Sequence, residues 1–431
     1  MPVMTPRERV LAALNHVEPD RVPVDLSGHR SSGIAAIAYP KLREYLGLEP
    51  RPIRVYDVIQ QLAVVDEDVL DRFGVDCIEM GRGFALDSDS WKPWTLPDGT
   101  DCLIPAWTRM ERRADRWVIL SNSGKVFAHM PDGTLYFEQT YFPLAGVAGV
   151  PPASDEGILP SNHGRDALDT RDALATLDEA FGECMWTGVA APPGPVDPQT
   201  LRQGAARFRA STDRAIVGLF GGNLFETGQF FYRADNFFML LAGEPKKAHR
   251  FLDRLVEIHL ANLEKFLAAV GPSIDIILFG DDLGMQTGPM LSPRMYCEFF
   301  KPRHQQLWTR AKELADVKVM LHCCGGVREL LPHLIEAGLD AINPVQITCA
   351  GMDAAQLKAE FGRDLTFWGG GCDTRDVLTN ARPAQVAAHV RNQVRLLTPG
   401  GGFVFQQVHN ILANVPPENI VAMLDAVNAA G

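Results

Sequence analysis

Long apolar runs are absent from this chain of 431 residues. No window approaches the ~18 uninterrupted apolar residues that a membrane-spanning helix needs. The start of the chain, from Met1 to Glu8, is polar and leads directly into an amphipathic segment, so we expect no signal peptide. These absences predict a cytoplasmic protein that does not act at a membrane.

Cysteine and positive charge are also scarce. The eight cysteines follow no paired pattern in so long a chain, so we expect reduced thiols rather than a disulfide framework. The 41 Lys and Arg residues are outnumbered by 53 Asp and Glu residues, which leaves a formal net charge of −12. So acidic a balance argues against nucleic acid as the main partner. The 46% of hydrophobic residues is nevertheless enough for a large core.

The alternation of apolar runs with helical stretches predicts the fold. We expect eight strands, at Val22–Asp25, Val75–Met80, Ala215–Phe220, Ile274–Phe279, Val317–Leu321, Ala341–Pro344, Leu365–Trp368 and Phe403–Val408. Continuous apolar strands spaced by helices indicate a parallel sheet, and eight such units predict an α/β protein with a TIM (β/α)8 barrel. A doubly wound open sheet is the alternative, but no Gly-x-Gly-x-x-Gly sequence follows any of these strands.

Capping and turn residues add detail to this prediction. Thr5, Pro6 and Glu8 predict the start of a capped helix. Further helices are expected at Asp57–Gln61, Arg171–Phe181, Pro245–Val270, Pro293–Ala315, Ala354–Phe361 and Pro383–Leu397. The sequence Pro-Asp-Gly-Thr occurs at 97–100 and again at 131–134, and Asp-Gly between apolar runs predicts hairpins. We therefore expect a barrel from residues 1–83 and 200–431, with residues 84–199 forming an antiparallel β-rich insertion and loops packed on it.

Polar residues gather after the predicted strands, which is where barrel enzymes carry their chemistry. The candidates are Asp25, His29, Glu79, Asp282, His322, Cys324, Asn343, Gln346, Cys372 and His409. Strand ends are also polar for reasons of solvation, so no single one of these residues defines a site. If the barrel forms, all of them lie at one mouth.

The segment His322-Cys323-Cys324-Gly325 is the most specific of these signals. A His and a Cys two residues apart on an extended strand point the same way, so both can bind one ion. Zinc suits such mixed nitrogen and sulfur ligands. His409 is the best candidate for a third ligand and Cys372 the next, and Asp282 can complete a tetrahedron. The alternative is that both cysteines are buried core residues and that His322 has only a structural role.

These motifs give the chain a resemblance to the uroporphyrinogen decarboxylase superfamily. The resemblance rests on the helix with Arg7-Glu8-Arg9, on Pro19-Asp20-Arg21-Val22-Pro23-Val24, on Gly280-Asp281-Asp282-Leu283-Gly284, on the His322-x-Cys324-Gly325 unit and on Pro416-Pro417-Glu418-Asn419-Ile420. It implies a TIM-type barrel over nearly the whole chain. True decarboxylases of this superfamily carry a Met-Arg-Gln-Ala-Gly-Arg-like loop after the first strand, and residues 25–30 of this chain lack it.

The other branch of the superfamily is similar to methylcobalamin:coenzyme M methyltransferases and corrinoid-linked O-demethylases. There a His-x-Cys pair and a residue of the last strand bind zinc, which implies His322 and Cys324 as ligands here. His409 stands where the coenzyme M enzymes usually have a cysteine. The resemblance therefore implies a zinc-containing methyltransferase that works with cobalamin on a separate corrinoid protein. A homodimer is a further expectation from the family.

The predicted reaction moves a methyl group between the corrinoid protein and a small molecule, for instance a methoxylated aromatic. We assign catalytic roles to Asp282, Glu79 and His29, and substrate contacts to Asn343, Gln346 and Asp25. Two alternatives remain. One is a metal-free lyase like uroporphyrinogen decarboxylase, in which Asp25 or Asp282 stabilises a cationic intermediate. The other is a non-catalytic protein that binds a corrinoid or tetrapyrrole.

Overall fold

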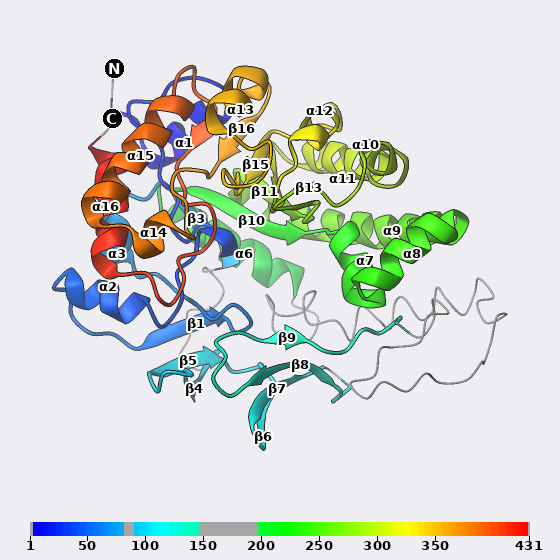
Figure 1. Cartoon of the computed structure of the whole chain (residues 1–431), viewed down its shortest axis with the longest axis horizontal. Coiled ribbons are helices and arrows are strands. Elements are labelled where there is room, and N and C mark those ends of the chain that lie inside the picture. The colour runs from blue at the N-terminus through cyan, green and yellow to red at the C-terminus, as the bar shows by residue number, and fades with distance from the viewer. Residues whose placement is uncertain (1–2, 82–89, 122, 146–196, 430–431) are drawn as a thin grey trace. The chain divides into compact units, whose positions relative to one another are not determined.

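The computed structural model describes residues 3–81, 90–121, 123–145 and 197–429 (Figure 1). The chain divides into two compact units. Unit 1 comprises Met1–Ala106, Val196–Gly222 and Leu260–Gly431, and unit 2 comprises Trp107–Pro195 and Asn223–His259. Unit 1 thus takes in residues 90–106 of the predicted insertion, and unit 2 takes in residues 223–259 of the predicted barrel. The helix predicted at Arg171–Phe181 lies outside the described residues.

A parallel sheet of seven strands forms the centre of unit 1 (Figure 1). Its strands, in spatial order, are β17 (Phe403–Val404), β16 (Thr366–Trp368), β15 (Ala341–Asn343), β14 (Lys318–His322), β11 (Ile276–Gly280), β10 (Ala215–Gly221) and β3 (Cys77–Glu79). Every neighbouring pair runs parallel. Seven of the eight predicted strands are therefore confirmed, most of them shorter than predicted.

The eighth predicted strand, Val22–Asp25, joins the two edges of this sheet. Val24 forms an isolated parallel bridge with Phe405, and the backbone N–H of Asp25 donates to the Phe405 carbonyl at 2.8 Å. On the other side, the backbone N–H of Asp76 donates to the Val24 carbonyl at 2.8 Å. Because Phe405 follows β17 and Asp76 precedes β3, these bonds close the sheet. The predicted TIM-like barrel is confirmed.

Alternation along the strands decides what fills the barrel. Its apolar core consists of Cys77, Ala215, Val217, Ile276, Leu278, Met320, Ala341, Trp368 and Val404, with Val10, Ala13 and Leu14 from helix α1 (Pro6–Leu14). Side chains two residues apart on a strand share a face. His322 therefore follows Met320 on the inner face, just as Asn343 follows Ala341. These two polar residues lie above the apolar core, at the carboxyl ends of the strands.

Helix α1 closes the opposite end of the barrel. The backbone N–H of Gly402, just before β17, donates to the Ala13 carbonyl at 2.9 Å. The predicted capping box is confirmed, because the Thr5 side chain accepts from the Glu8 N–H and the Glu8 carboxylate accepts from the Thr5 N–H.

The other described helices of unit 1 are α2 (Tyr39–Tyr45), α3 (Glu67–Arg72), α6 (Pro198–Ala210), α10 (Pro293–Met295), α11 (Lys301–Leu314), α12 (Leu331–Glu336), α13 (Ala354–Phe361), α14 (Val377–Asn380), α15 (Pro383–Leu397) and α16 (Pro417–Asn428). Helix α9 (Pro245–Val270) has the predicted bounds and contributes residues to both units.

Two helix predictions are wrong in detail. The helix expected at Pro293–Ala315 is interrupted by one π-helical stretch, Tyr296–Phe300, which lies between α10 and α11. The helix expected at Asp57–Gln61 does not form, because β1 (Ile53–Asp57) pairs with β2 (Leu62–Ala63) and with β5 (Asp101–Pro105), and the residues after it form a turn.

The hairpins predicted from Asp-Gly are present. In unit 1, β4 (Trp91–Thr95) pairs antiparallel with β5 around the first Pro-Asp-Gly-Thr. In unit 2, β6 (Met110–Arg113), β7 (Arg116–Leu120), β8 (Val126–Pro131) and β9 (Glu138–Gln139) form an antiparallel sheet, with the second Pro-Asp-Gly-Thr between β8 and β9. Helices α7 (Phe225–Tyr232) and α8 (Ala234–Gly243) also belong to unit 2.

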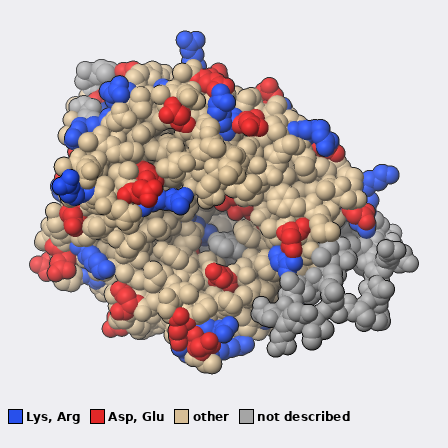
Figure 2. Space-filling model, in the orientation of Figure 1, with Lys and Arg blue, Asp and Glu red and all other residues tan. Residues whose placement is uncertain are grey.

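The surface of the described residues carries charged side chains of both signs (Figure 2). Figure 2 shows Lys and Arg side chains scattered among Asp and Glu on the visible face of the described residues. Among the helices of the described ranges, none combines the length and the apolar character that crossing a membrane demands.

Candidate metal centre

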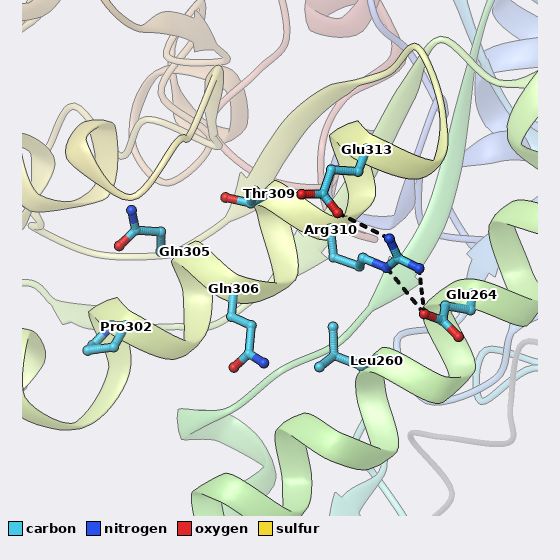
Figure 3. A pocket seen from close by; sticks show the side chains of 8 residues that line it. All are labelled: Leu260, Glu264, Pro302, Gln305, Gln306, Thr309, Arg310 and Glu313. Carbon is cyan, nitrogen blue, oxygen red and sulfur yellow. Dashed lines mark hydrogen bonds and ion pairs between the residues drawn. The ribbon is translucent and has the colours of Figure 1, made fainter.

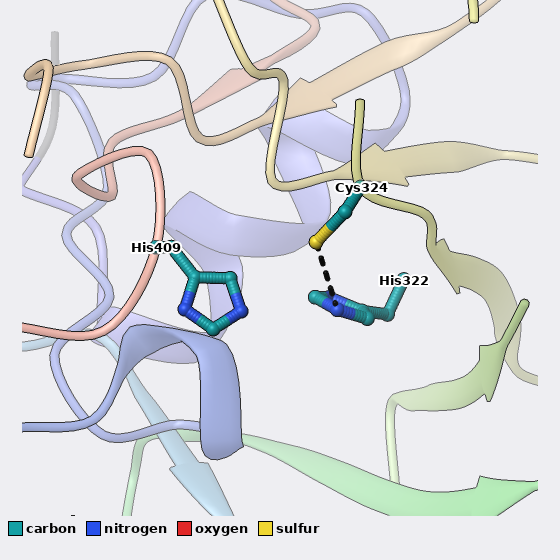
Figure 4. Close-up of side chains that lie close together, drawn as sticks. All are labelled: His322, Cys324 and His409. Atoms are coloured by element: carbon teal, nitrogen blue, oxygen red, sulfur yellow. Dashed lines mark hydrogen bonds between the residues drawn. The ribbon is translucent and has the colours of Figure 1, made fainter. Parts of the chain in front are cut away.

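Three predicted ligands meet at the carboxyl end of the barrel. The ligand atoms of His322, Cys324 and His409 all lie within 4.8 Å of one another, and each residue is partly buried (Figure 4). Cys324 Sγ lies 3.5 Å from His322 Nε2, and the two imidazole centroids are 5.7 Å apart. In the described part of the chain this is the one group of three or more His, Cys, Asp or Glu residues able to share an ion.

The local backbone explains why Cys324 turns toward the site and Cys323 away from it. His322 ends β14, and the extended chain places Cys323 on the opposite face, where it is 2% exposed and its Sγ accepts the Leu283 N–H. Gly325 follows with a φ of +90°, and a Cβ there would lie 2.1 Å from the carbonyl carbon of Gly284. Only glycine allows this close approach of two backbone segments.

His409 is held as a neutral imidazole. Its Nδ1 lies 2.8 Å from Oδ1 of Asn410, whose Nδ2 in turn donates to Gln60 Oε1 at 2.9 Å. Burial, together with the neighbouring His322, lowers the pKa of His409 from 6.5 to about 4. A neutral imidazole whose Nδ1 bonds to an amide oxygen presents Nε2 as the free lone pair, as a metal ligand must.

Of the two adjacent carboxylates, one belongs to the site. Asp282 Oδ1 accepts the backbone N–H of Cys324 at 2.7 Å and lies 3.7 Å from His322 Nε2. Asp281 is fully buried on the other side, where its Oδ2 lies 3.1 Å from Nε2 of His304. This division agrees with the prediction that Asp282 lies near the ligands.

Gln346 and Asn343 support the ligands. Gln346 Oε1 accepts the Gly325 N–H at 2.9 Å and so fixes the loop after Cys324. Asn343 is fully buried, and its Oδ1 lies 2.9 Å from His322 Nδ1. Asn343 thus contacts the candidate ligand His322, and its predicted substrate contact stays a prediction.

Asp25 and His29 form a buried pair beneath the site. They are 0% and 1% exposed, and His29 Nε2 lies 3.2 Å from Asp25 Oδ2. Asp25 Oδ2 accepts the indole N–H of Trp368 at 2.7 Å. Both side chains are thus buried, and their predicted substrate and catalytic roles stay predictions.

Glu79 and Cys372 stand apart from the three ligands. Glu79 ends β3 and is 9% exposed. Cys372 is fully buried, its Sγ lies 3.7 Å from the Asp373 carbonyl, and burial raises the pKa of its thiol. Cys372 is therefore not a member of the ligand group.

Sequence reasoning missed the residues that orient the histidines. These are Ser31, Gln60 and Gln406, all of which hydrogen-bond within the network around His322 and His409. The two-residue alternation along a strand could have identified Gln406, because it lies two residues after Val404, whose side chain belongs to the barrel core, just as His322 lies two residues after Met320. The other residues lie outside the strands, where side chains do not alternate in this way.

A pocket elsewhere in unit 1 offers no comparable chemistry. It measures about 470 Å³ and is lined by Leu260, Glu264, Pro302, Gln305, Gln306, Thr309, Arg310 and Glu313 (Figure 3). The Arg310 guanidinium bridges Glu264 at 2.8 Å and Glu313 at 3.1 Å, so the charges of this open pocket are paired.

Fold and ligand geometry together define a (β/α)8-barrel protein with a candidate His/Cys/His metal centre. Residues 227–430 of this chain match the family model described as uroporphyrinogen decarboxylase (URO-D). His322, Cys324 and His409 all lie within the matched residues.

Individual relatives agree with this family. A uroporphyrinogen decarboxylase of Legionella pneumophila is 28% identical over 191 residues, which are 44% of this chain and 50% of that protein. One from Psychromonas ingrahamii is 27% identical over 188 residues, 43% of this chain and 49% of that protein. The chain thus matches about half the length of these relatives. A methyltransferase from Methanosarcina mazei has a similar fold, with a TM-score of 0.56, 16% identity and 99% coverage of both chains.

Proposed function

We propose that this protein is a zinc-dependent methyltransferase that moves a methyl group between a small molecule and a separate corrinoid protein. The observation that carries the proposal is the convergence of His322, Cys324 and His409 within 4.8 Å at the barrel mouth. Carboxyl ends of barrel strands are where enzymes of this fold hold their active sites. The fold similarity to a methyltransferase over the whole chain supports the same choice.

The donor set fits zinc. Two imidazole nitrogens and one thiolate are ligands that zinc prefers, and three protein ligands leave a fourth position for a substrate. When bound, zinc would supply Lewis acidity toward the oxygen or sulfur that carries the methyl group. A single thiolate donates less electron density than two, so this donor set suits an ether oxygen at least as well as a thiol. We therefore favour a methoxylated aromatic as the methyl donor.

The chain's own residues would position the reaction. Asp282 lies beside His322 and accepts the Cys324 N–H, and in this proposal it would hold a proton near the leaving group or serve as a fourth ligand. Gln346 fixes the loop that carries Cys324. The chain has no Asp-x-His-x-x-Gly sequence of its own, so the corrinoid that exchanges the methyl group would come on a partner protein.

Uroporphyrinogen decarboxylation is the second candidate, because the curated relatives carry that name. A porphyrinogen with many carboxylates needs several cationic side chains. In the loop at residues 25–30 the one arginine, Arg30, lies 3.2 Å from the Asp57 carboxylate. An arginine already paired with a carboxylate is poorly suited to bind another, so we rank this reaction second.

Metal analysis tests the proposal. Purified protein should contain about one equivalent of zinc by mass spectrometry, and Cys324→Ser should lose most of it. Cys323→Ser is the matched control, since the neighbouring Cys323 points away from the site and should retain zinc. Wild-type protein without zinc, or equal zinc content in both variants, would rule out the metal centre.

The reaction itself needs a separate assay. Methylation of cob(I)alamin by a panel of methoxylated aromatics is followed by the change in the cobalamin spectrum, and release of CO2 from uroporphyrinogen is measured in parallel. Methyl transfer that depends on Cys324 supports the proposal. Release of CO2 without methyl transfer would favour the decarboxylase.

A further inference from the structure

The side chain of Asn343 has only one possible orientation. It is fully buried at the end of β15, and its Nδ2 donates to the backbone carbonyl of Trp368 at 2.8 Å and to Gln406 Oε1 at 2.7 Å. A backbone carbonyl can only accept a hydrogen bond. Turning the amide over would place two oxygens against each other inside the barrel, so Trp368 fixes which atom of Asn343 faces the site.

The oxygen of Asn343 therefore faces His322. Asn343 Oδ1 lies 2.9 Å from His322 Nδ1, and an amide oxygen can only accept. The proton of a neutral His322 must then reside on Nδ1. Nε2 is left with its lone pair, and it is Nε2 that lies 3.5 Å from Cys324 Sγ. The free lone pair thus points toward the other ligands.

The same amide oxygen determines hydrogen-bond direction on its far side. Ser31 Oγ lies 2.7 Å from Asn343 Oδ1 and must donate its single proton there. Ser31 Oγ also lies 3.2 Å from His29 Nδ1, so at that contact the hydroxyl accepts and His29 donates. One buried amide therefore sets the direction of every bond from His322 to His29.

We propose that Asn343 is a positioning residue that holds His322 as the Nδ1–H tautomer and thereby prepares the site for zinc. The inference rests on the proposed metal centre only for its consequence, because the tautomer is a property of the protein without metal. Partners of this kind orient a ligating histidine and fix its tautomer, and their loss weakens metal binding. A neutral amide does this while leaving more positive charge on the ion than a carboxylate would.

Two substitutions separate this role from simple packing. Asn343→Leu removes the acceptor, so His322 should lose its single tautomer and the zinc dissociation constant should rise about 10–100-fold. Asn343→Asp keeps an oxygen that accepts from His322, and burial favours the protonated acid, whose O–H can replace Nδ2 as the donor to the Trp368 carbonyl. The tautomer should therefore persist and zinc should bind within about threefold of wild type. A residue that only fills space would leave the tautomer of His322 the same in both variants.

Nitrogen-15 NMR of the imidazole side chains in metal-free protein reads the tautomer, and competition with a chelator gives the dissociation constant. Asn419→Leu and Asn419→Asp are the matched controls. Asn419 is 2% exposed, and its Nδ2 also donates to two acceptors, the carbonyls of Leu378 and Ala381. Its variants lose the same donors but should leave the spectrum of His322 and the zinc affinity unchanged.

The outcomes are distinct. A proton on Nε2 of His322 in metal-free wild type would overturn the inference, as would equal losses of zinc in both Asn343 variants or in the Asn419 controls. A wild-type protein that shows the Nδ1–H tautomer but binds no zinc would leave Asn343 as the residue that sets the tautomer and would refute the proposed function instead.

Discussion

Asp282 and Cys324 are joined by a short hydrogen bond, in which Asp282 Oδ1 accepts the Cys324 backbone N–H at 2.7 Å. The same oxygen lies 3.7 Å from His322 Nε2. The Asp282 carboxylate therefore fixes the backbone of Cys324 and lies next to His322, a second candidate ligand. Its charge and its hydrogen bond make separate contributions, which substitutions can distinguish.

Removing that charge should weaken metal binding. Asp282→Asn keeps an oxygen for the Cys324 N–H but loses the negative charge beside the ligands, so we expect zinc affinity to fall about 10-fold or more. Chelator competition measures it. The adjacent Asp281→Asn is the control, because Asp281 faces His304 away from the site. A similar loss of zinc in both variants would contradict a specific role for Asp282.

Acid should destabilise the metal-free protein through His409. Burial lowers the pKa of His409 from 6.5 to about 4, so between these pH values the unfolded state binds a proton that the folded state excludes. The free energy of unfolding therefore falls as the pH drops through this window, by about 3 kcal/mol for this group. Urea unfolding from pH 7 to pH 4 should show this slope in wild type and a shallower one in His409→Gln. Parallel curves for the two proteins would contradict the assignment.

The loop after Cys324 should tolerate no side chain at residue 325. In Gly325→Ala the new Cβ would lie 2.1 Å from the Gly284 backbone, so we expect a loss of about 3 kcal/mol or more together with loss of zinc. Gly351→Ala is a matched control. Its φ is +76° but the nearest atom to a Cβ is 3.5 Å away, so only the backbone penalty of about 1–2 kcal/mol remains. Thermal unfolding and zinc content should differ clearly between the two variants.

Arg9 should be essential for the stability of the barrel. It is 4% exposed and lies 2.6 Å from both Asp20 and Asp76, of which Asp76 is fully buried. Arg9→Met removes one of the positive charges that pair with the buried Asp76 carboxylate. We therefore expect the free energy of unfolding to fall by about 3–5 kcal/mol. Arg7→Met, on the same helix, removes a half-exposed partner of Asp275 and should cost about 1 kcal/mol or less. Equal losses would mean that burial does not govern these pairs.

Much of the fold could be predicted because its signals are local. The bounds of the helices at 245–270, 354–361 and 383–397 follow from apolar periodicity and from the residues at their starts, and the structure has the same bounds. The strands were recognisable as apolar runs between helices. Prediction failed at Asp57–Gln61, where β1 pairs antiparallel with β2 and the residues between them form a turn. It also failed at the π-helical stretch within 293–315, which a helical period does not reveal.

The pair of candidate ligands His322 and Cys324 could also be predicted from local sequence. His322 and Cys324 are two residues apart at the end of a strand, so extended geometry alone places both on one side. His409 was harder to assign, because Cys372 follows a neighbouring strand and offers a thiolate, which zinc also binds. Only the folded chain separates the two residues, since it buries Cys372 completely and brings His409 beside His322.

The amino-acid order by itself determined the separate strands and helices, the hairpins and the His-x-Cys unit, because each depends on residues within a few positions of one another. Tertiary structure decided how the histidines are oriented. Ser31 reaches Asn343 across 312 positions, and Asn410 reaches Gln60 across 350. Hydrogen-bond direction in such a network depends on which donors and acceptors the closed barrel brings into contact, and no local pattern in the sequence encodes that contact.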